Sequence, residues 1–350
     1  MAAGGVRVDG NALVLGAARV SFMRTLRLPE SGTHGLPPGL GQFPLRRVED
    51  YPDTAPPQWL AKGGVMLPVY LREAMWLGFG GTLEPTAVQV GVGKVCAVSG
   101  ERWTGRLARR PQNYVVPPRQ PWLDGINSGD GTVRQFVAVP LGLGATVEGQ
   151  VTGEETTGGV QLQAFALSPE PLARWREAEQ RSAMRTRGFT GGYGGGPVPP
   201  PMAAAPGAAP AMPQPGGAAP AAPAMGLGVG GSMRQEVYGD DRPLSDWAEE
   251  AAGRVFVHLV TPPAWRRITG EEPPPSPVDR AAYTKAGLPW FDYYDESAAD
   301  LAPAGPLTEV RPVGEWLGDD HAPWTPPAPG QVKPLGNAPR PGVPVEDGDW

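Results

Sequence analysis

The residues best suited to chemistry form a polar group that begins at a tight turn. Trp122 and Asp124 lie in the run PWLDG, which places an indole and a carboxylate beside a glycine. The stretches that follow are predicted to be neighbouring strands, and they carry Arg134, Gln135, Glu148 and Gln150. Such a sheet would form a polar pocket with an aromatic wall, in which paired carboxylates can serve general acid–base catalysis. The structural alternative is a salt-bridged turn with Trp122 in the core.

A second group of candidates is aromatic. The run LPWFDYYD contains Trp290, Phe291, Asp292, Tyr293 and Tyr294. Tryptophan and tyrosine dominate the hot spots of protein interfaces, so this run is a candidate partner-binding surface. The alternative is that the same rings cap the core of the preceding part of the chain.

Other reactive residue types indicate no catalytic or metal site. Cys96 is the one cysteine, and its place in the run VCAV predicts a buried side chain rather than a reactive nucleophile. None of the three histidines has a second histidine or a cysteine at metal-ligand spacing. His258 falls in mid-strand, where a hydrogen-bonded structural role is expected. The sequence therefore predicts no metal and no cofactor.

The elements that must position these residues are mostly short strands. Residues 1–187 contain alternating runs rich in Val, Phe and Tyr, separated by turn residues about every ten positions, as in antiparallel sandwiches and barrels. In the run from Thr132 to Leu141, Gln135 would share a face with three valines, which is unusual. Residues 168–187 predict a basic surface helix, residues 245–253 another helix and residues 254–260 a strand.

Composition divides the chain into four parts. Residues 188–231 contain no charged residue and consist largely of Gly, Pro and Ala, which predicts a disordered linker. Residues 232–297 predict a small α+β segment that packs on the N-terminal part, residues 1–187, because a piece of this size is marginal alone. Residues 298–350 are Pro-rich and acidic and predict a largely disordered tail, with Trp316 and Trp324 pinning it to a surface. The predicted fold class is β-rich α+β, with a sandwich- or barrel-like sheet completed after the insert.

Charge and hydropathy limit the partners. Residues 1–187 carry 20 basic against 16 acidic residues, and residues 188–350 carry 10 against 20. Because a nucleic-acid binder more often has a strong basic excess, we expect no nucleic acid. No run is long and apolar enough to span a membrane, although the basic segment 172–187 could contact one peripherally. The single cysteine and the absence of a secretory signal at the N-terminus indicate the cytoplasm.

Several long phrases resemble those of an uncharacterised microbial protein family. They include PQNYVVPPRQPWLDG, VRQFVAVPLGLG and AGLPWFDYY, and together they cover most of residues 1–167 and 233–295. The resemblance skips the linker and the tail. It implies that both ordered blocks belong to one recurring unit, and it implies no activity, cofactor or site residue.

Two functions follow from these observations. The first is a non-catalytic binding or scaffolding protein with a protein partner, because nucleophile, metal and cofactor signatures are missing. The second is an enzyme, a hydrolase or a sugar- or nucleotide-modifying enzyme, that uses the polar pocket near Trp122 and Asp124. The sequence leaves the oligomeric state open.

Overall fold

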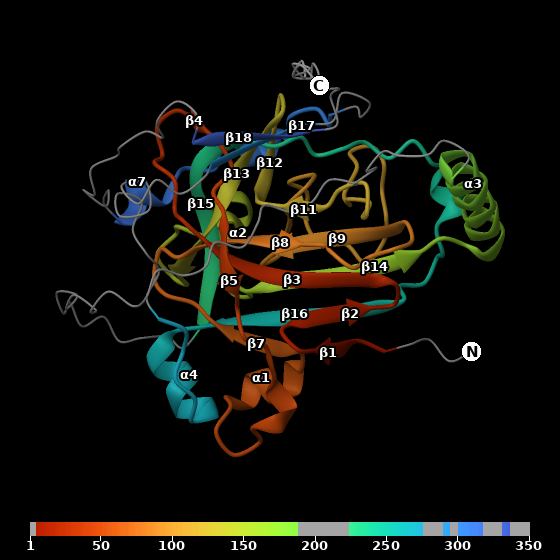
Figure 1. Ribbon diagram of the computed structural model, residues 1–350. Helices are drawn as coiled ribbons and strands as arrows, with labels where there is room; N and C mark the ends of the chain where they lie inside the picture. Colours follow the sequence, from red (N-terminus) through yellow and green to blue (C-terminus); the bar gives the residue numbers. More distant parts are fainter. Residues whose placement is uncertain (1–4, 188–223, 276–289, 295–299, 318–330, 337–350) are drawn as a thin grey trace, which may run out of the picture.

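Strands from both sides of the glycine-rich insert join in one sheet (Figure 1). The computed structural model describes residues 5–187, 224–275, 290–294, 300–317 and 331–336. Within these residues the sheet contains β1 (Arg7–Asp9), β2 (Ala12–Leu15), β3 (Ala18–Thr25), β4 (Thr33–His34), β5 (Gly39–Gln42), β6 (Arg46–Arg47), β7 (Val65–Pro68), β8 (Ala74–Gly78), β9 (Thr86–Val92), β10 (Val95–Cys96), β11 (Trp122–Leu123), β12 (Gly125–Gly129), β13 (Thr132–Pro140), β14 (Val160–Ala166), β15 (Ala224–Arg234) and β16 (Gly253–Val260).

Helical segments are mostly short. Among the described residues they are η1 (Val48–Asp50), α1 (Pro57–Lys62), α2 (Val147–Thr152), α3 (Pro169–Arg187), η2 (Leu244–Asp246), α4 (Pro262–Thr269), α6 (Gly305–Thr308) and α7 (Val313–Leu317). Two further strands, β17 (Trp290–Tyr294) and β18 (Val332–Gly336), form a separate parallel pair.

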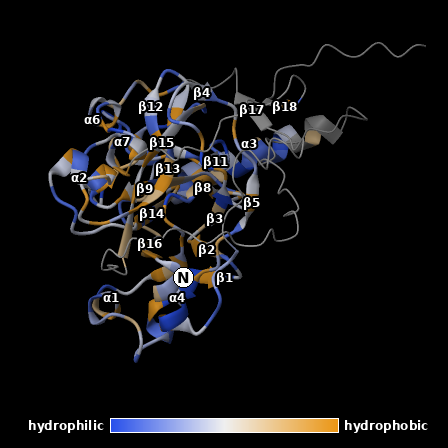
Figure 2. Cartoon of the chain, turned by 90° about the vertical axis from the view of Figure 1, so that its left-hand side faces the viewer, coloured by the Kyte–Doolittle hydropathy of each residue, from blue (hydrophilic) through white to orange (hydrophobic). Residues whose placement is uncertain are grey.

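The long sheet runs in the order β1-β2-β3-β8-β13-β15-β16-β14-β9-β10 and folds back on itself. Strands β8, β3 and β2 lie in one layer and β9, β14 and β16 in the other, overlapping in Figure 1 and separated in Figure 2. Most pairs are antiparallel, whereas β15 pairs with β4 and β16 with β7 in parallel. One hydrophobic core joins both layers, and its buried members include Phe22, Trp122, Leu162 and Leu259.

The predicted β-rich α+β class is confirmed. The sequence predicts either a sandwich-like or a barrel-like sheet. Because the sheet is not closed into a barrel, the sandwich-like alternative is the one that fits. Strands β15 and β16, which follow the insert, lie between β13 and β14 of the N-terminal part. The later segment therefore completes the earlier sheet.

The glycine-rich strand β15 begins before the predicted end of the linker. Composition places that end at residue 231, whereas the strand starts at Ala224. The glycines of β15 have no side chain, so neighbouring segments can pack directly against the strand. A Cβ at Gly226 would lie 2.6 Å from Thr146 Cγ2, and a Cβ at Gly228 would lie 2.6 Å from the Ala145 oxygen. Close packing on these positions offsets the entropy that glycine loses in a strand. Residues 188–223 lie outside the described residues.

Part of the predicted tail is packed on the body. Leu307, Val310 and Val313 are buried. Asp300 accepts hydrogen bonds from the backbone nitrogens of Gly131 and Val237 at 2.6 and 2.9 Å. The expectation of a largely disordered tail is therefore wrong for residues 300–317. The apolar residues recur every three positions there, which suits short turns packed on a core.

Helix α3 is the basic helix that the sequence predicts. Its residues Leu172 and Trp175 pack against a small cluster that contains Phe165 and Trp247, while Met184 is exposed. An ion pair of 2.6 Å joins Arg176 of this helix to Glu84. Among the described residues, no helix combines the length and the apolar character needed to cross a membrane.

Candidate functional site

Asp124 is buried in the core beside its predicted partner Trp122. Its backbone nitrogen donates to Gln235 Oε1 at 2.9 Å, and its Oδ2 atom has no hydrogen-bond partner among the described residues. Burial raises the pKa of Asp124 to about 7, and the neighbouring Trp122 side chain opposes this shift. The Trp122 side chain is fully buried, as the structural alternative expects.

Gln135 has a structural role that explains its place among valines. Its Nε2 atom donates to the Leu26 oxygen at 2.7 Å, and its Oε1 atom accepts from the Leu28 nitrogen at 2.9 Å. These are the two bonds that a residue of a parallel neighbouring strand would make. Its neighbour Arg134 points the other way and donates to the Val310 oxygen.

Glu148 and Gln150 lie on helix α2, so their predicted strand is wrong. The side chain of Thr146 caps the helix by accepting from the Gly149 nitrogen at 2.9 Å, and Gly153 ends it with a φ of +77°. Glu148 is buried and accepts from the backbone nitrogen of Gly158 at 2.8 Å.

Gln150 joins α2 to the C-terminal segment. Its Oε1 atom accepts from the Arg311 nitrogen at 2.6 Å, and its Nε2 atom donates to the Arg311 oxygen at 3.1 Å. Of the six predicted pocket residues, Gln150 is the one that lines a groove between α2, α6 and α7. The structure does not bring Asp124, Arg134 and Glu148 into one pocket, because each contacts a different internal segment.

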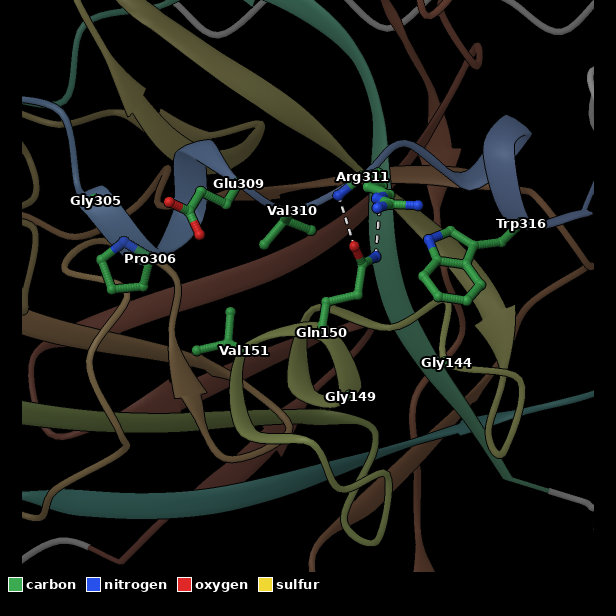
Figure 3. A pocket seen from close by; sticks show the side chains of 10 residues that line it. All are labelled: Gly144, Gly149, Gln150, Val151, Gly305, Pro306, Glu309, Val310, Arg311 and Trp316. Atoms are coloured by element: carbon green, nitrogen blue, oxygen red, sulfur yellow. Dashed lines mark hydrogen bonds between the residues drawn. The ribbon is translucent and has the colours of Figure 1, made fainter.

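A groove of about 690 Å³ lies between α2, α6 and α7. Figure 3 shows Gln150 and Val151 on one side, facing Val310 and Arg311, with the Trp316 ring at one end. The Trp316 side chain is 41% exposed. A Cβ at Gly144 would lie 3.0 Å from this ring. The groove is lined by Gly144, Gly149, Gln150, Val151, Gly305, Pro306, Glu309, Val310, Arg311 and Trp316.

This groove presents mixed chemistry. Glu309 and Arg311 are exposed and carry opposite charges, Trp316 offers an apolar face with an N–H group, and Val151 and Val310 supply apolar contact. Such a surface suits a ligand that has both polar and apolar groups. The sequence predicts roles for Gln150 and Trp316. It gives no signal for the groove residues between 305 and 311, because the tail is predicted to be disordered.

The predicted aromatic interface is described only in its backbone. Residues 290–294 form β17, which pairs in parallel with β18. The positions of the side chains of Trp290, Phe291, Asp292, Tyr293 and Tyr294 lie outside the described part of the structure. Both the interface and the core-cap alternatives stay predictions.

Cys96 and His258, the other reactive residues that the sequence singles out, both lie in the interior. Cys96 is buried, its Sγ atom lies 3.3 Å from the Asn113 oxygen, and burial raises the pKa of its thiol. His258 is buried against Trp59, with ring centroids 4.6 Å apart, and its Nε2 atom lies 2.9 Å from the Gly63 oxygen. Burial lowers the pKa of His258 to about 4. The described residues contain no group of three or more His, Cys, Asp or Glu that could hold a metal ion.

The chain has no significant match among protein-family models, curated proteins or solved structures. The resemblance to an uncharacterised microbial family therefore stays a prediction.

Proposed function

We propose that the protein is a non-catalytic binding or scaffolding protein that holds a polar peptide segment of a protein partner in the α2–α6–α7 groove. The observation that carries the proposal is the partly exposed Trp316 ring at one end of this groove, beside Arg311. Tryptophan and arginine are the residue types that most often dominate binding energy at interfaces. We place this function in the cytoplasm, in keeping with the single buried cysteine.

A peptide fits the groove better than a compact apolar ligand. Glu309 and Arg311 offer an acceptor and a donor of opposite charge on the same segment, and Gln150 already anchors that segment through both backbone groups of Arg311. The wall is therefore held in place before a partner binds, which reduces the entropic cost of association.

The enzymatic alternative has less support. It requires Asp124, Arg134 and Glu148 to act on one substrate, whereas Asp124 and Glu148 are buried in separate surroundings. Glu148 uses its carboxylate to hold the backbone at Thr157 and Gly158. No described contact favours a hydrolase or a sugar- or nucleotide-modifying enzyme at this position.

Cross-linking from the groove tests the proposal. Because Cys96 is buried, a cysteine introduced by Glu309→Cys can be labelled selectively with a photo-cross-linker. The matched control is Leu83→Cys, at an exposed position that does not line the groove. We expect a partner to be captured from position 309 and not from position 83.

Affinity measured with the purified partner then decides the role of the groove. Truncation of a hot-spot tryptophan costs about 2 kcal/mol or more, so Trp316→Ala should weaken binding by roughly thirtyfold. Leu83→Ala should leave the affinity unchanged. Equal capture from both positions, or equal affinity of the Trp316→Ala variant and the wild type, would refute the proposal.

A further inference from the structure

A second concave surface lies on the outer face of the β14–β16 layer. Its volume is about 400 Å³. The register pairs Gln161 of β14 with Phe256 of β16 and with Gly91 of β9, so these residues share the face. We call this surface the cationic pocket. Its lining includes Arg7, Arg47, Lys62, Trp103, Arg254 and Phe256.

Positive charge gathers in this pocket although the protein as a whole is acidic. Four of its lining residues are basic and one, Glu49, is acidic, whereas the formal net charge of the chain is −6. Arg47 forms ion pairs with Glu49 and Asp50 at 2.7 and 2.5 Å. By contrast, the other three cations form no ion pair with any residue that the structure describes.

Two aromatic rings line the same pocket. The Lys62 Nζ atom lies 3.4 Å from the centroid of the Phe256 ring. The indole of Trp103 covers Gly91, where a Cβ would lie 2.6 Å from its ring. Glycine at position 91 therefore allows the indole to lie close to the sheet. Burial lowers the pKa of Lys62, because the charged ammonium is partly removed from water. A bound anion would stabilise this ammonium, so binding of an anion beside it is favoured.

We propose that the cationic pocket binds a small organic anion that combines phosphate groups with a flat ring, as a nucleoside diphosphate does. Lys62, Arg7 and Arg254 would contact the phosphate oxygens, because charge-assisted hydrogen bonds from arginine and lysine are the strong ones to such groups. Trp103 would stack on the ring, an interaction that tolerates many ring types. This site is separate from the groove of the proposed function.

Calorimetric titration of the full chain with ADP tests the proposal. Pyrophosphate supplies the charge without the ring, and adenosine supplies the ring without the charge. We expect ADP to bind more tightly than either, and its affinity to fall as salt is raised. No binding of ADP at millimolar concentration, or equal binding of pyrophosphate or adenosine, would overturn the proposal.

Charge reversal locates the site. Arg254 is exposed, so Arg254→Glu should fold, and it should weaken ADP binding by about tenfold or more. Arg181→Glu makes the same charge change on an exposed residue of α3 and should leave binding unchanged. Trp103→Phe, which keeps a ring, should bind more tightly than Trp103→Ala. Equal effects of the two charge reversals, or tighter binding of an oligonucleotide in proportion to its length, would contradict the assignment.

Discussion

Gln135 provides a sharp test of how the core is held together. Its carboxamide lies in the interior and bonds the Leu26 oxygen and the Leu28 nitrogen. Replacement by leucine keeps the approximate size of the side chain but removes both bonds. Two buried backbone groups are then left without partners, and each such group costs about 1–3 kcal/mol.

We expect the Gln135→Leu variant to lose roughly 2–4 kcal/mol of unfolding free energy. This figure allows for the free energy gained by burying the apolar leucine side chain. Urea unfolding followed by circular dichroism measures it, and the midpoint should fall by about 1 M. The matched control is Gln42→Leu, because Gln42 is exposed and its bond to Ser21 Oγ is long, at 3.4 Å. That control should stay within about 0.5 kcal/mol of the wild type.

A pH-dependent variant separates hydrogen bonding from packing. A protonated glutamate at position 135 can donate to Leu26 and accept from Leu28, whereas the carboxylate cannot donate. Burial would raise the pKa of the glutamate in Gln135→Glu above its unfolded value of about 4.3. The stability of this variant is therefore retained below about pH 4.3 and lost as the pH rises through the folded pKa. The urea midpoint of Gln135→Glu should therefore lie further below that of the wild type at pH 8 than at pH 5. An unchanged midpoint for Gln135→Leu, or a pH-independent deficit for Gln135→Glu, would refute the reasoning.

Two further substitutions test burial and close packing. Because the pKa of Asp124 is raised to about 7 in the folded state, its contribution to stability is present below about pH 4 and is lost as the pH rises through 7. Asp124→Asn does not titrate, so its unfolding free energy, measured in urea, should gain roughly 2.5 kcal/mol relative to the wild type between pH 5 and 8. A constant difference would contradict this. A Cβ at Gly231 would overlap the Pro29 oxygen, so Gly231→Ala should lower the thermal midpoint strongly, whereas Gly80→Ala, with open space around it, should not. Equal midpoints for the two alanine variants would show that β15 is not closely packed.

Elements with a clear hydrophobic alternation can be predicted from the sequence. Strand β16 carries Val255, Val257 and Leu259 toward the core, as its period of two indicates. Helix α2 escapes such a prediction because Val147 and Val151, four residues apart, fit a strand face and a helix face equally well.

Tertiary contacts decide the elements that local patterns misassign. The sequence predicts a helix over residues 245–253, but the structure contains only the turn η2 and the start of β16 there. The backbone nitrogens of Ala248 and Ala252 donate to Ala166 and Ala164 at 2.9 and 2.8 Å, so the segment pairs with the end of β14 instead. No local signal in the sequence specifies that pairing.

The candidate site is only partly predictable for a related reason. Gln150 stands out as a polar residue, but its partner Arg311 lies 161 positions away in a Pro-rich segment. The apolar spacing of Leu307, Val310 and Val313 is a usable signal that this segment packs on the core. Acidic and proline-rich composition masks that signal.

Glutamines in and near the core supply a common solution to the irregular backbone of this fold. A carboxamide has one acceptor and one donor group, like a peptide unit, so it can pair with an extended segment that lacks a neighbouring strand. Four of the five such pairs described here join a segment before the insert to one after it, which makes the two segments depend on each other for their backbone hydrogen bonds. The pairs are Gln112 with Tyr238 and Asp240, Gln120 with Glu236 and Tyr238, Gln235 with Trp122 and Asp124, Gln150 with Arg311, and, within the N-terminal part, Gln135 with Leu26 and Leu28.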